Sequence, residues 1–255
     1  MQLNKKLIIT GKITALTGIA VGGTNAAMSI GGVDKGVIRN PVTNEPYIPG
    51  SSLKGKLRSL LELRDGTLGE EAMGIVKNGP TTDQKDRAAR LFGNAVKGDK
   101  NIQRPSRVVV RDAYLDPDQV KANFFKNADL PFTEVKTEVV IDRITSRAMP
   151  RQIERVPAGA KFKFELVLTF FSDDIELTAA VNLNDQSLED QIVKDLFSAI
   201  QLLQNDYLGA AGSRGSGQIR FESSSMKVEK RDRKFYEMDG PATDVTSDYQ
   251  QFFPK

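Results

Sequence analysis

The stretch KFKFELVLTFF, residues 161–171, is the clearest structural signal in the sequence. Its first half alternates charged residues at Lys161, Lys163 and Glu165 with apolar ones, and its second half is mainly apolar. Alternation with a period of two is typical of a half-buried β-strand, and a short apolar run is typical of a buried one. The stretch therefore predicts a strand that passes from the edge of the core into its interior.

Further elements lie on both sides of this strand. Six segments have the periodicity of core elements, in the order strand, helix, strand, strand, helix, strand: residues 4–16, 51–65, 107–115, 161–171, 187–206 and 218–229. Ser51 or Ser52 can cap the first helix, and Ser187 can cap the second. The order is that of the ferredoxin-like (RRM-like) βαββαβ core. The sequence therefore predicts an α+β fold in a single domain that spans residues 1–255.

Long intervals separate these core elements. Residues 17–50, 66–106 and 116–160 are predicted to be insertions, and residues 230–255 a C-terminal tail. The second insertion is expected to be helical from Asp83 to Phe92. Intervals of this length are uncommon in a compact domain unless they carry a function. The tail is expected to be loose, with docking of its end on a neighbouring subunit as the alternative.

Composition excludes several kinds of catalysis. The sequence contains neither Cys nor His, which rules out thiolate nucleophiles, HExxH metal sites and His-based acid–base pairs. The net charge is only +3, so a polyanion would have to be bound by local clusters of basic residues. No apolar stretch approaches the roughly 20 residues needed to cross a bilayer, and the N-terminus lacks the core of a signal peptide. We expect a soluble cytoplasmic protein without membrane contact.

The segment GSSLKGKL, residues 50–57, carries the first basic cluster. It approaches the nucleotide-binding pattern GxxxxGK[ST], but leucine stands where the pattern needs a hydroxyl for magnesium. Lys54 and Arg58 lie four residues apart on one helix face, and backbone N–H groups near Ser51 and Ser52 can bind phosphates of RNA. A solvated helix face with a serine cap is the alternative.

A glycine-rich loop in LGAAGSRGSGQIRF, residues 208–221, forms the second cluster. Gly212 and Gly215 let the backbone approach an anion around Ser213, and Arg214 can contact a phosphate with two N–H groups. A flexible turn between helix and strand is the alternative.

Arginines recur every four residues at Arg143, Arg147, Arg151 and Arg155. Pro150 disfavours one continuous helix here, so we expect a projecting basic hairpin that binds RNA through the first three of these arginines. Three apolar side chains in the hairpin are able to wedge or stack: Ile144, Met149 and Ile153. An ordinary solvated hairpin is the alternative.

Asp34 follows a glycine pair in MSIGGVDKGVIRNP, residues 28–41, inside the first insertion. A carboxylate there can hold hydrated magnesium against a phosphate or orient an attacking 2′-hydroxyl. Taken alone, an exposed loop aspartate is more often structural or neutral.

Three blocks of the sequence together resemble the RAMP superfamily and, within it, the repeated backbone subunits of type III-A (Csm) CRISPR effector complexes. They are residues 30–62, 154–168 and 208–221, and the first is the most specific, because an Asp-bearing loop, YIPGSSLKG and a basic helix follow in the family's order. One departure is Ala20, where many relatives have His.

The resemblance implies a ferredoxin-like core with a helical insertion and a protruding thumb at residues 116–160. It also implies that several copies assemble along a guide RNA with other subunits of the complex. Asp34 would then cut single-stranded target RNA with Mg²⁺ or a similar divalent cation, while Lys54, Arg58 and the Arg214 loop hold the guide.

Two other functions remain open at the level of sequence. A non-catalytic RNA-binding scaffold is the alternative, because the loop of Asp34 has no obvious second carboxylate. A guide-processing nuclease is less favoured, because related processing enzymes often use His.

Overall fold

A computed structural model gives the structure of the chain. It describes residues 2–22, 36–68, 71–72, 75–76, 86–93, 105–172 and 188–255. Ser187 and Asp83 therefore lie outside the described residues, as does Asp34.

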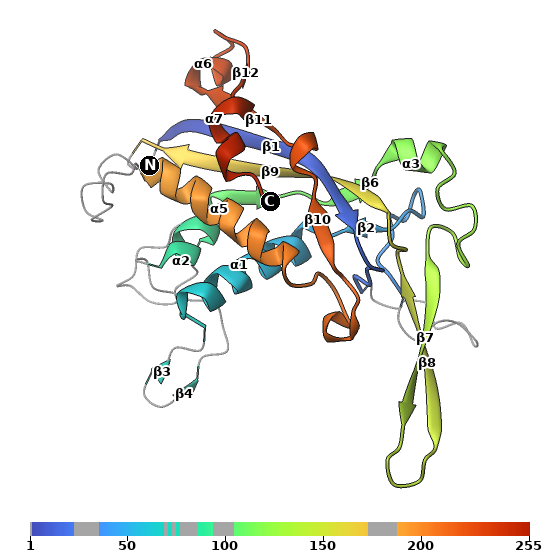
Figure 1. Cartoon of the computed structure of the whole chain (residues 1–255). Coiled ribbons are helices and arrows are strands. Elements are labelled where there is room, and N and C mark those ends of the chain that lie inside the picture. Colours follow the sequence, from blue (N-terminus) through green and yellow to red (C-terminus); the bar gives the residue numbers. More distant parts are fainter. Residues whose placement is uncertain are drawn as a thin grey trace.

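An antiparallel sheet forms the centre of the fold (Figure 1). From one edge to the other its strands are β12 (Thr243–Asp244), β11 (Lys227–Asp232), β1 (Leu3–Ala15), β9 (Lys161–Phe171), β6 (Ala113–Leu115) and β2 (Tyr47–Ile48). In addition, β10 (Ile219–Phe221) pairs with β1, and β5 (Val108–Val110) pairs with β9. Among the four predicted core strands, the order across the sheet is the fourth (β10 and β11), the first (β1), the third (β9) and the second (β5 and β6). This is the order of a ferredoxin-like sheet.

The pairing of β1 with β9 confirms the strand predicted at residues 161–171. Leu7 lies opposite Leu168 and Ile13 opposite Phe162, and all four side chains are buried. Because neighbouring residues of a strand point to opposite faces, the charged residues of β9 point to the other side of the sheet.

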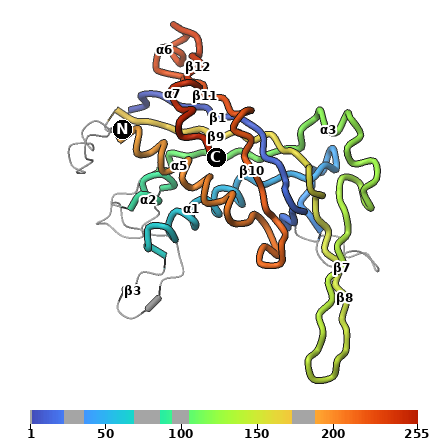
Figure 2. The backbone as a smooth tube through the Cα atoms, in the orientation of Figure 1, coloured from blue at the N-terminus to red at the C-terminus, as the bar shows by residue number. Residues whose placement is uncertain are grey.

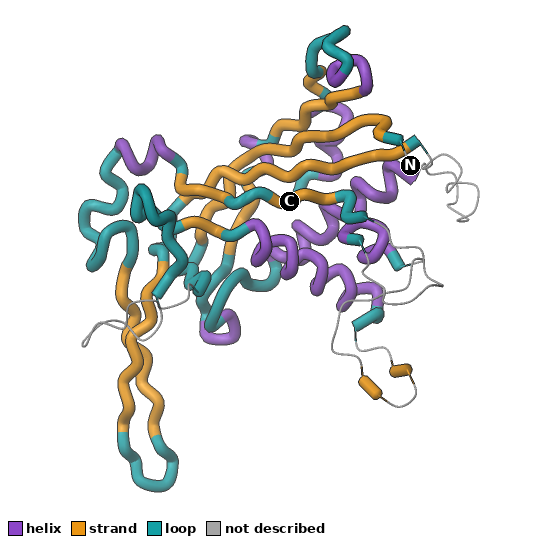
Figure 3. Tube along the Cα trace, turned by 180° about the vertical axis from the view of Figure 1, so that it is seen from behind, coloured by secondary structure: helices purple, strands orange, loops and turns teal. Residues whose placement is uncertain are grey.

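Two helices cover one face of this sheet, α1 (Gly50–Asp65) and α5 (Leu188–Gln204), as Figures 1 and 3 show. Their apolar stripes are buried in the same core, including Leu53 and Leu57 of α1 and Leu196 and Ile200 of α5. The predicted α+β, ferredoxin-like fold is confirmed by this arrangement.

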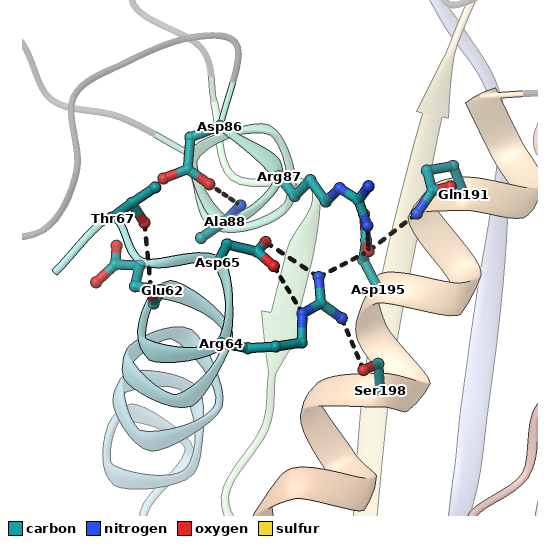
Figure 4. Close-up of polar contacts among 10 residues, drawn as sticks. All are labelled: Glu62, Arg64, Asp65, Thr67, Asp86, Arg87, Ala88, Gln191, Asp195 and Ser198. Atoms are coloured by element: carbon teal, nitrogen blue, oxygen red, sulfur yellow. Dashed lines mark hydrogen bonds and ion pairs between the residues drawn. The ribbon is translucent and has the colours of Figure 1, made fainter. Parts of the chain in front are cut away.

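The helical insertion is fastened to both core helices through α2 (Arg87–Phe92). Figure 4 shows the contact, in which Asp195 of α5 lies between Arg64 of α1 and Arg87, with N–O distances of 3.4 and 3.6 Å. Burial raises the pKa of Asp195, and the two arginines oppose that rise. The rest of the insertion includes two short paired strands, β3 (Glu71–Ala72) and β4 (Ile75–Val76).

The predicted serine cap of α1 is wrong. Pro49 occupies the N-cap position, and no side chain of Ser51 or Ser52, both described, caps the helix. Instead, the N–H of Gly50 donates to Oδ1 of Asp112 at 2.7 Å. A Cβ at Gly50 would overlap the backbone carbonyl of Val110, so the strand passes too close for any other residue.

Two predicted strands are interrupted. The strand predicted at residues 107–115 divides into β5 and β6 at Arg111 and Asp112. The strand predicted at residues 218–229 divides into β10 and β11 at a short helix, η2 (Ser223–Ser225). Both breaks let one predicted strand pair at two places in the sheet.

The third insertion begins with α3 (Pro117–Lys121) and ends in a two-stranded hairpin, β7 (Glu134–Ile141) and β8 (Ala148–Arg155). The hairpin projects from the body of the molecule, as the tube in Figure 2 shows. This is the predicted basic hairpin, and we call it the thumb.

The C-terminal tail is ordered against its own chain rather than loose. It contains α6 (Arg233–Tyr236), α7 (Thr246–Tyr249) and η3 (Gln250–Phe252). Phe253 is buried with its ring 5.5 Å from that of Phe197 in α5. The expectation of a loose tail is therefore wrong, because these aromatic side chains supply apolar area for packing.

Candidate nucleic-acid interface

The loop predicted to carry the catalytic Asp34 lies outside the described residues, but the chain on either side of it is placed. Gly22 and Val37 form an antiparallel bridge, and the N–H of Ile38 donates to the carbonyl of Val21 at 3.0 Å. The segment between them therefore leaves and re-enters the fold at one point.

On the first three turns of α1 the exposed side is a narrow stripe of small residues, Ser51, Gly55 and Ser59, and Leu63 follows it with 64% of its surface exposed. A Cβ at Gly55 would meet no atom within 4 Å, so this stripe is open. Residues four apart on a helix are neighbours, so Lys54 and Arg58 line one flank of the stripe, as predicted.

Both of these basic residues also have partners in the protein. Nζ of Lys54 donates to Oγ of Ser106 at 2.7 Å. Burial lowers the pKa of Lys54, and the charge of Arg58 lowers it further. Arg58 donates to Glu62 at 2.7 Å and to the carbonyl of Gly93 at 2.9 Å, which ties α1 to the end of α2. Phosphate binding by this pair stays a prediction.

Lys56 on the other flank was missed in the sequence analysis. Its Nζ lies 2.9 Å from Oδ2 of Asp206 and 4.0 Å from the centre of the Tyr207 ring. Ser52 and Lys56 are four residues apart, as are Lys54 and Arg58, so they also share a helix face. This spacing could have indicated Lys56 as a second basic residue beside the stripe.

The glycine-rich loop lies next to these residues and folds around η1 (Gly212–Arg214). A Cβ at Gly212 would overlap the ring of Tyr207, so the close packing of loop and ring requires glycine there. A pocket of about 500 Å³ separates the loop from the end of α5. Its lining is polar and includes Thr17, Gln204, Asp206, Tyr207, Gly215 and Ser216.

Arg214 connects this loop to the thumb. Its Nη1 lies 2.8 Å from Oε2 of Glu138 on β7, and Glu138 lies opposite Arg151 in the pairing of β7 with β8. The hydrogen bond from Lys136 and the charge of Arg214 lower the pKa of Glu138, which is therefore an anion at neutral pH. The structure thus brings Arg214 to the carboxylate of Glu138, and Arg151 lies opposite Glu138 in the strand register.

Arg143 and Arg147 lie apart from this cluster, in the turn of the thumb, where Asp142 donates its N–H to the carbonyl of Arg147 at 2.9 Å. The turn and the strand ends beside it expose several apolar side chains: Val139, Val140, Ile141, Ile144 and Met149. Ile144 is the most exposed of these, at 95%.

Ala20 supports the glycine-rich loop from its other side. Its carbonyl accepts the N–H of Ala210 at 2.8 Å, and its side chain is buried. A Cβ at Gly209 would crowd the same carbonyl at 2.5 Å. The backbone contact at position 20 is therefore independent of the side chain there.

Two absences concern the described residues. Within the described ranges, no group of three or more acidic side chains could hold a metal ion. In the same ranges, none of the helices is both long enough and apolar enough to span a membrane.

Comparison with known proteins supports the sequence resemblance. The family model described as the RAMP superfamily matches residues 12–220. A protein of Methanocaldococcus jannaschii named "CRISPR system Cms endoribonuclease Csm3" is 37% identical, over 93% of this chain and 86% of its own. A protein of the same name from Enterococcus italicus is 38% identical, over 87% of this chain and 92% of its own.

A solved structure gives a similar result for the fold. The "Crystal structure of Csm3-Csm4 subcomplex in the type III-A CRISPR-Cas interference complex" contains a chain with 27% identity and a TM-score of 0.55. The match covers 98% of this chain and 96% of that chain. The chain therefore belongs to the RAMP superfamily and, within it, to the Csm3 family.

Proposed function

We propose that this chain is an endoribonuclease subunit of a type III-A CRISPR effector complex, in which it binds guide RNA and cuts complementary target RNA. One observation carries the proposal. The Lys56–Asp206 ion pair joins α1 to the residues that lead into the glycine-rich loop, and the Arg214–Glu138 ion pair joins that loop to the thumb. The names of the relatives at 37% and 38% identity support the activity.

Guide RNA fits the described part of this surface. The open stripe on α1 lets a sugar–phosphate backbone approach the helix closely, and Lys54 and Lys56 lie on its two flanks. Phosphate contacts of this kind give affinity without sequence specificity. A subunit that has to bind guides of different sequence needs contacts of this type.

Asp34 is proposed as the catalytic residue. Asp34 stands two positions before Gly36, where the described chain resumes. Magnesium commonly binds proteins through one or two carboxylates together with substrate phosphates, so a single Asp with the target phosphate fits Mg²⁺. Such an ion would stabilise the charge that develops on the phosphate.

The thumb is proposed to contact the duplex of guide and target. Arg143, Arg147 and Arg151 can bind phosphates, and the exposed Ile144 and Met149 can stack on or wedge between bases. Neighbouring copies along the guide would then place thumbs, and sites with Asp34, at regular intervals. We place this activity in the cytoplasm.

Replacement of Asp34 tests the function. Complexes that carry Asp34→Ala should bind target RNA with affinity within about twofold of the wild type and lose cleavage by about a hundredfold or more. Single-turnover cleavage of a labelled target measures the rate, and filter binding measures the affinity. Asp239→Ala, which removes an exposed carboxylate in the tail, is the matched control and should cleave normally.

Unchanged cleavage by Asp34→Ala would favour the scaffold function, with cutting by another subunit. The absence of an acidic cluster from the described residues is the observation that keeps this alternative open. Incubation of the isolated protein with repeat RNA tests guide processing, which should not occur.

A further inference from the structure

Glu154 is a buried carboxylate at the base of the thumb, and only 5% of the residue is exposed. It lies on β8 and accepts a hydrogen bond from Oγ1 of Thr133 at 2.7 Å. It also accepts the backbone N–H of Val37 at 3.0 Å and pairs with Nη2 of Arg39 at 2.5 Å. A buried charge is costly unless it is paired and hydrogen-bonded, so this degree of pairing is what allows a carboxylate here.

The carboxylate is ionised in the folded protein. Burial by itself raises the pKa of Glu154, but the hydrogen bonds from Thr133 and Arg39 and from the N–H of Val37 outweigh it. The net pKa lies below the ordinary value of 4.5. Glu154 therefore holds Arg39 and Val37 as an anion at neutral pH.

Arg39 extends the contact to three segments. Its Nη1 donates to the carbonyls of Asn44 and Pro131, at 2.8 and 2.9 Å, and its Nη2 donates to Thr133 at 2.8 Å. Pro131 and Thr133 directly precede β7. The segment that follows Asp34 is thus held at the base of the thumb, by Glu154 on β8 and by residues 131–133, which lead into β7.

The same thumb base also holds the chain before the loop. Ile19 and Val156 exchange two backbone hydrogen bonds, at 2.9 and 2.8 Å. Val156 is two residues beyond Glu154, and the bridge between Gly22 and Val37 closes the loop. Both chain segments that flank the loop of Asp34 are therefore fixed to residues 154–156.

We infer that Glu154 is a positioning residue for cleavage, which couples the thumb to the return of the loop that carries Asp34. The inference rests on the proposed function. Glu154 holds Val37 and Arg39, which follow Asp34 by three and five positions, to β8, so the return of the loop keeps a fixed place against the thumb. Loss of the anion leaves the thumb folded and the bridge between Val37 and Gly22 in place, but it weakens the bond that holds Val37 to β8.

Glu154→Gln is the direct test in the assembled complex, because glutamine keeps the shape of the side chain and removes its charge. The single-turnover cleavage rate should fall by about tenfold to a hundredfold, while affinity for target RNA stays within about twofold. Thr133→Val, which removes one donor to Glu154, should give a smaller effect in the same direction. In the double variant the cleavage rate should fall by less than the product of the two single fold-losses, since both changes act on one cluster.

Hydrogen exchange supplies a readout that does not depend on cleavage. The amide of Val37 should exchange faster in Glu154→Gln, because its acceptor is weakened, while the amides of β7 and β8 farther along the thumb keep their protection. Uniformly faster exchange throughout the thumb would show that Glu154 only stabilises the fold, and would overturn the inference.

Asp195→Asn is the matched control, because Asp195 is also a buried carboxylate between arginines but lies among the helices (Figure 4). It should leave the cleavage rate unchanged. If Asp34→Ala abolishes cleavage and Glu154→Gln does not slow it, the coupling is wrong and the proposed function stands. If Asp34→Ala cleaves normally, the proposed function itself fails.

Discussion

At the scale of single residues, the two carboxylates at the thumb have different roles. Glu154 is buried and joins protein segments, whereas Glu138 pairs with Arg214, whose side chain is 63% exposed. A phosphate that binds Arg214 would have to compete with Glu138. The free chain thus holds its predicted guide-binding arginine in an ion pair.

Glu138→Gln should therefore strengthen guide binding. An exposed ion pair contributes about 0.2–1 kcal/mol, so we expect about a 1.4-fold to fivefold gain in affinity. Fluorescence anisotropy with a labelled guide RNA at fixed salt measures it. Glu165→Gln, which frees Arg111 on the far side of the sheet, is the control with the same change in net charge. An equal gain in both variants would assign the effect to net charge.

The sequence predicted which basic side chains lie near one another on a helix, but it did not predict the groups that these side chains contact. Lys54 and Arg58 were predicted to share a face, and this follows from a spacing of four on any helix. That Arg58 contacts the carbonyl of Gly93, 35 residues away, depends on how the insertion packs. The link between Glu154 and Val37 spans 117 residues and has no sequence pattern.

At the scale of elements, the stripe on α1 combines weak helix propensity with an open surface. Gly55 in the middle of the helix costs about 1 kcal/mol relative to alanine. Nothing in the packing requires glycine there, since a Cβ at this position would have no atom within 4 Å. A residue that lowers stability without a packing reason is expected to serve binding.

Gly55→Ala should accordingly raise the free energy of unfolding of the free protein by up to about 1 kcal/mol, and it should weaken guide binding. Thermal unfolding measures the first effect and anisotropy the second. A variant that is more stable and binds RNA with unchanged affinity would show that the guide does not cross the stripe.

Periodicity predicted most elements of the core but not their ends. It located β9, α1, α5 and the thumb, because each has several turns or repeats of pattern. It did not separate β5 from β6, because the break at Asp112 serves to cap α1, a contact across 62 residues. The strands β10 and β11 were predicted as one strand because both pair with β1. The interruption at η2 depends on a contact across 213 residues, in which Oγ of Ser225 accepts the N–H of Lys12.

At the scale of the whole molecule, acid should destabilise the fold through its paired carboxylates. The pKa values of Glu154, Asp116 and Glu222 are lowered in the folded state, in each case by hydrogen bonds and cations that outweigh burial. A lowered folded pKa means that the stabilisation is present above the unfolded value and is lost as pH falls through the folded value.

The melting temperature should therefore fall as pH drops below about 4.5 and should fall less steeply in Glu154→Gln. Asp195 acts in the opposite direction, because its pKa is raised in the folded state and its protonation therefore favours folding. The melting temperature of Asp195→Asn should accordingly fall more steeply with decreasing pH than that of the wild type. Calorimetry from about pH 3 to about pH 7 measures the three slopes. Parallel curves for all three proteins would contradict the assigned pKa directions.

The bridge between Gly22 and Val37 has a consequence for how such chains diversify. When the two ends of a segment are already joined, the entropic cost of its length grows only logarithmically, by about 0.6 kcal/mol for each doubling. Insertions between these residues would leave the ferredoxin-like core almost untouched. Selection can therefore vary the length of the segment that carries the proposed catalytic Asp34 while the proposed guide-binding surface stays constant.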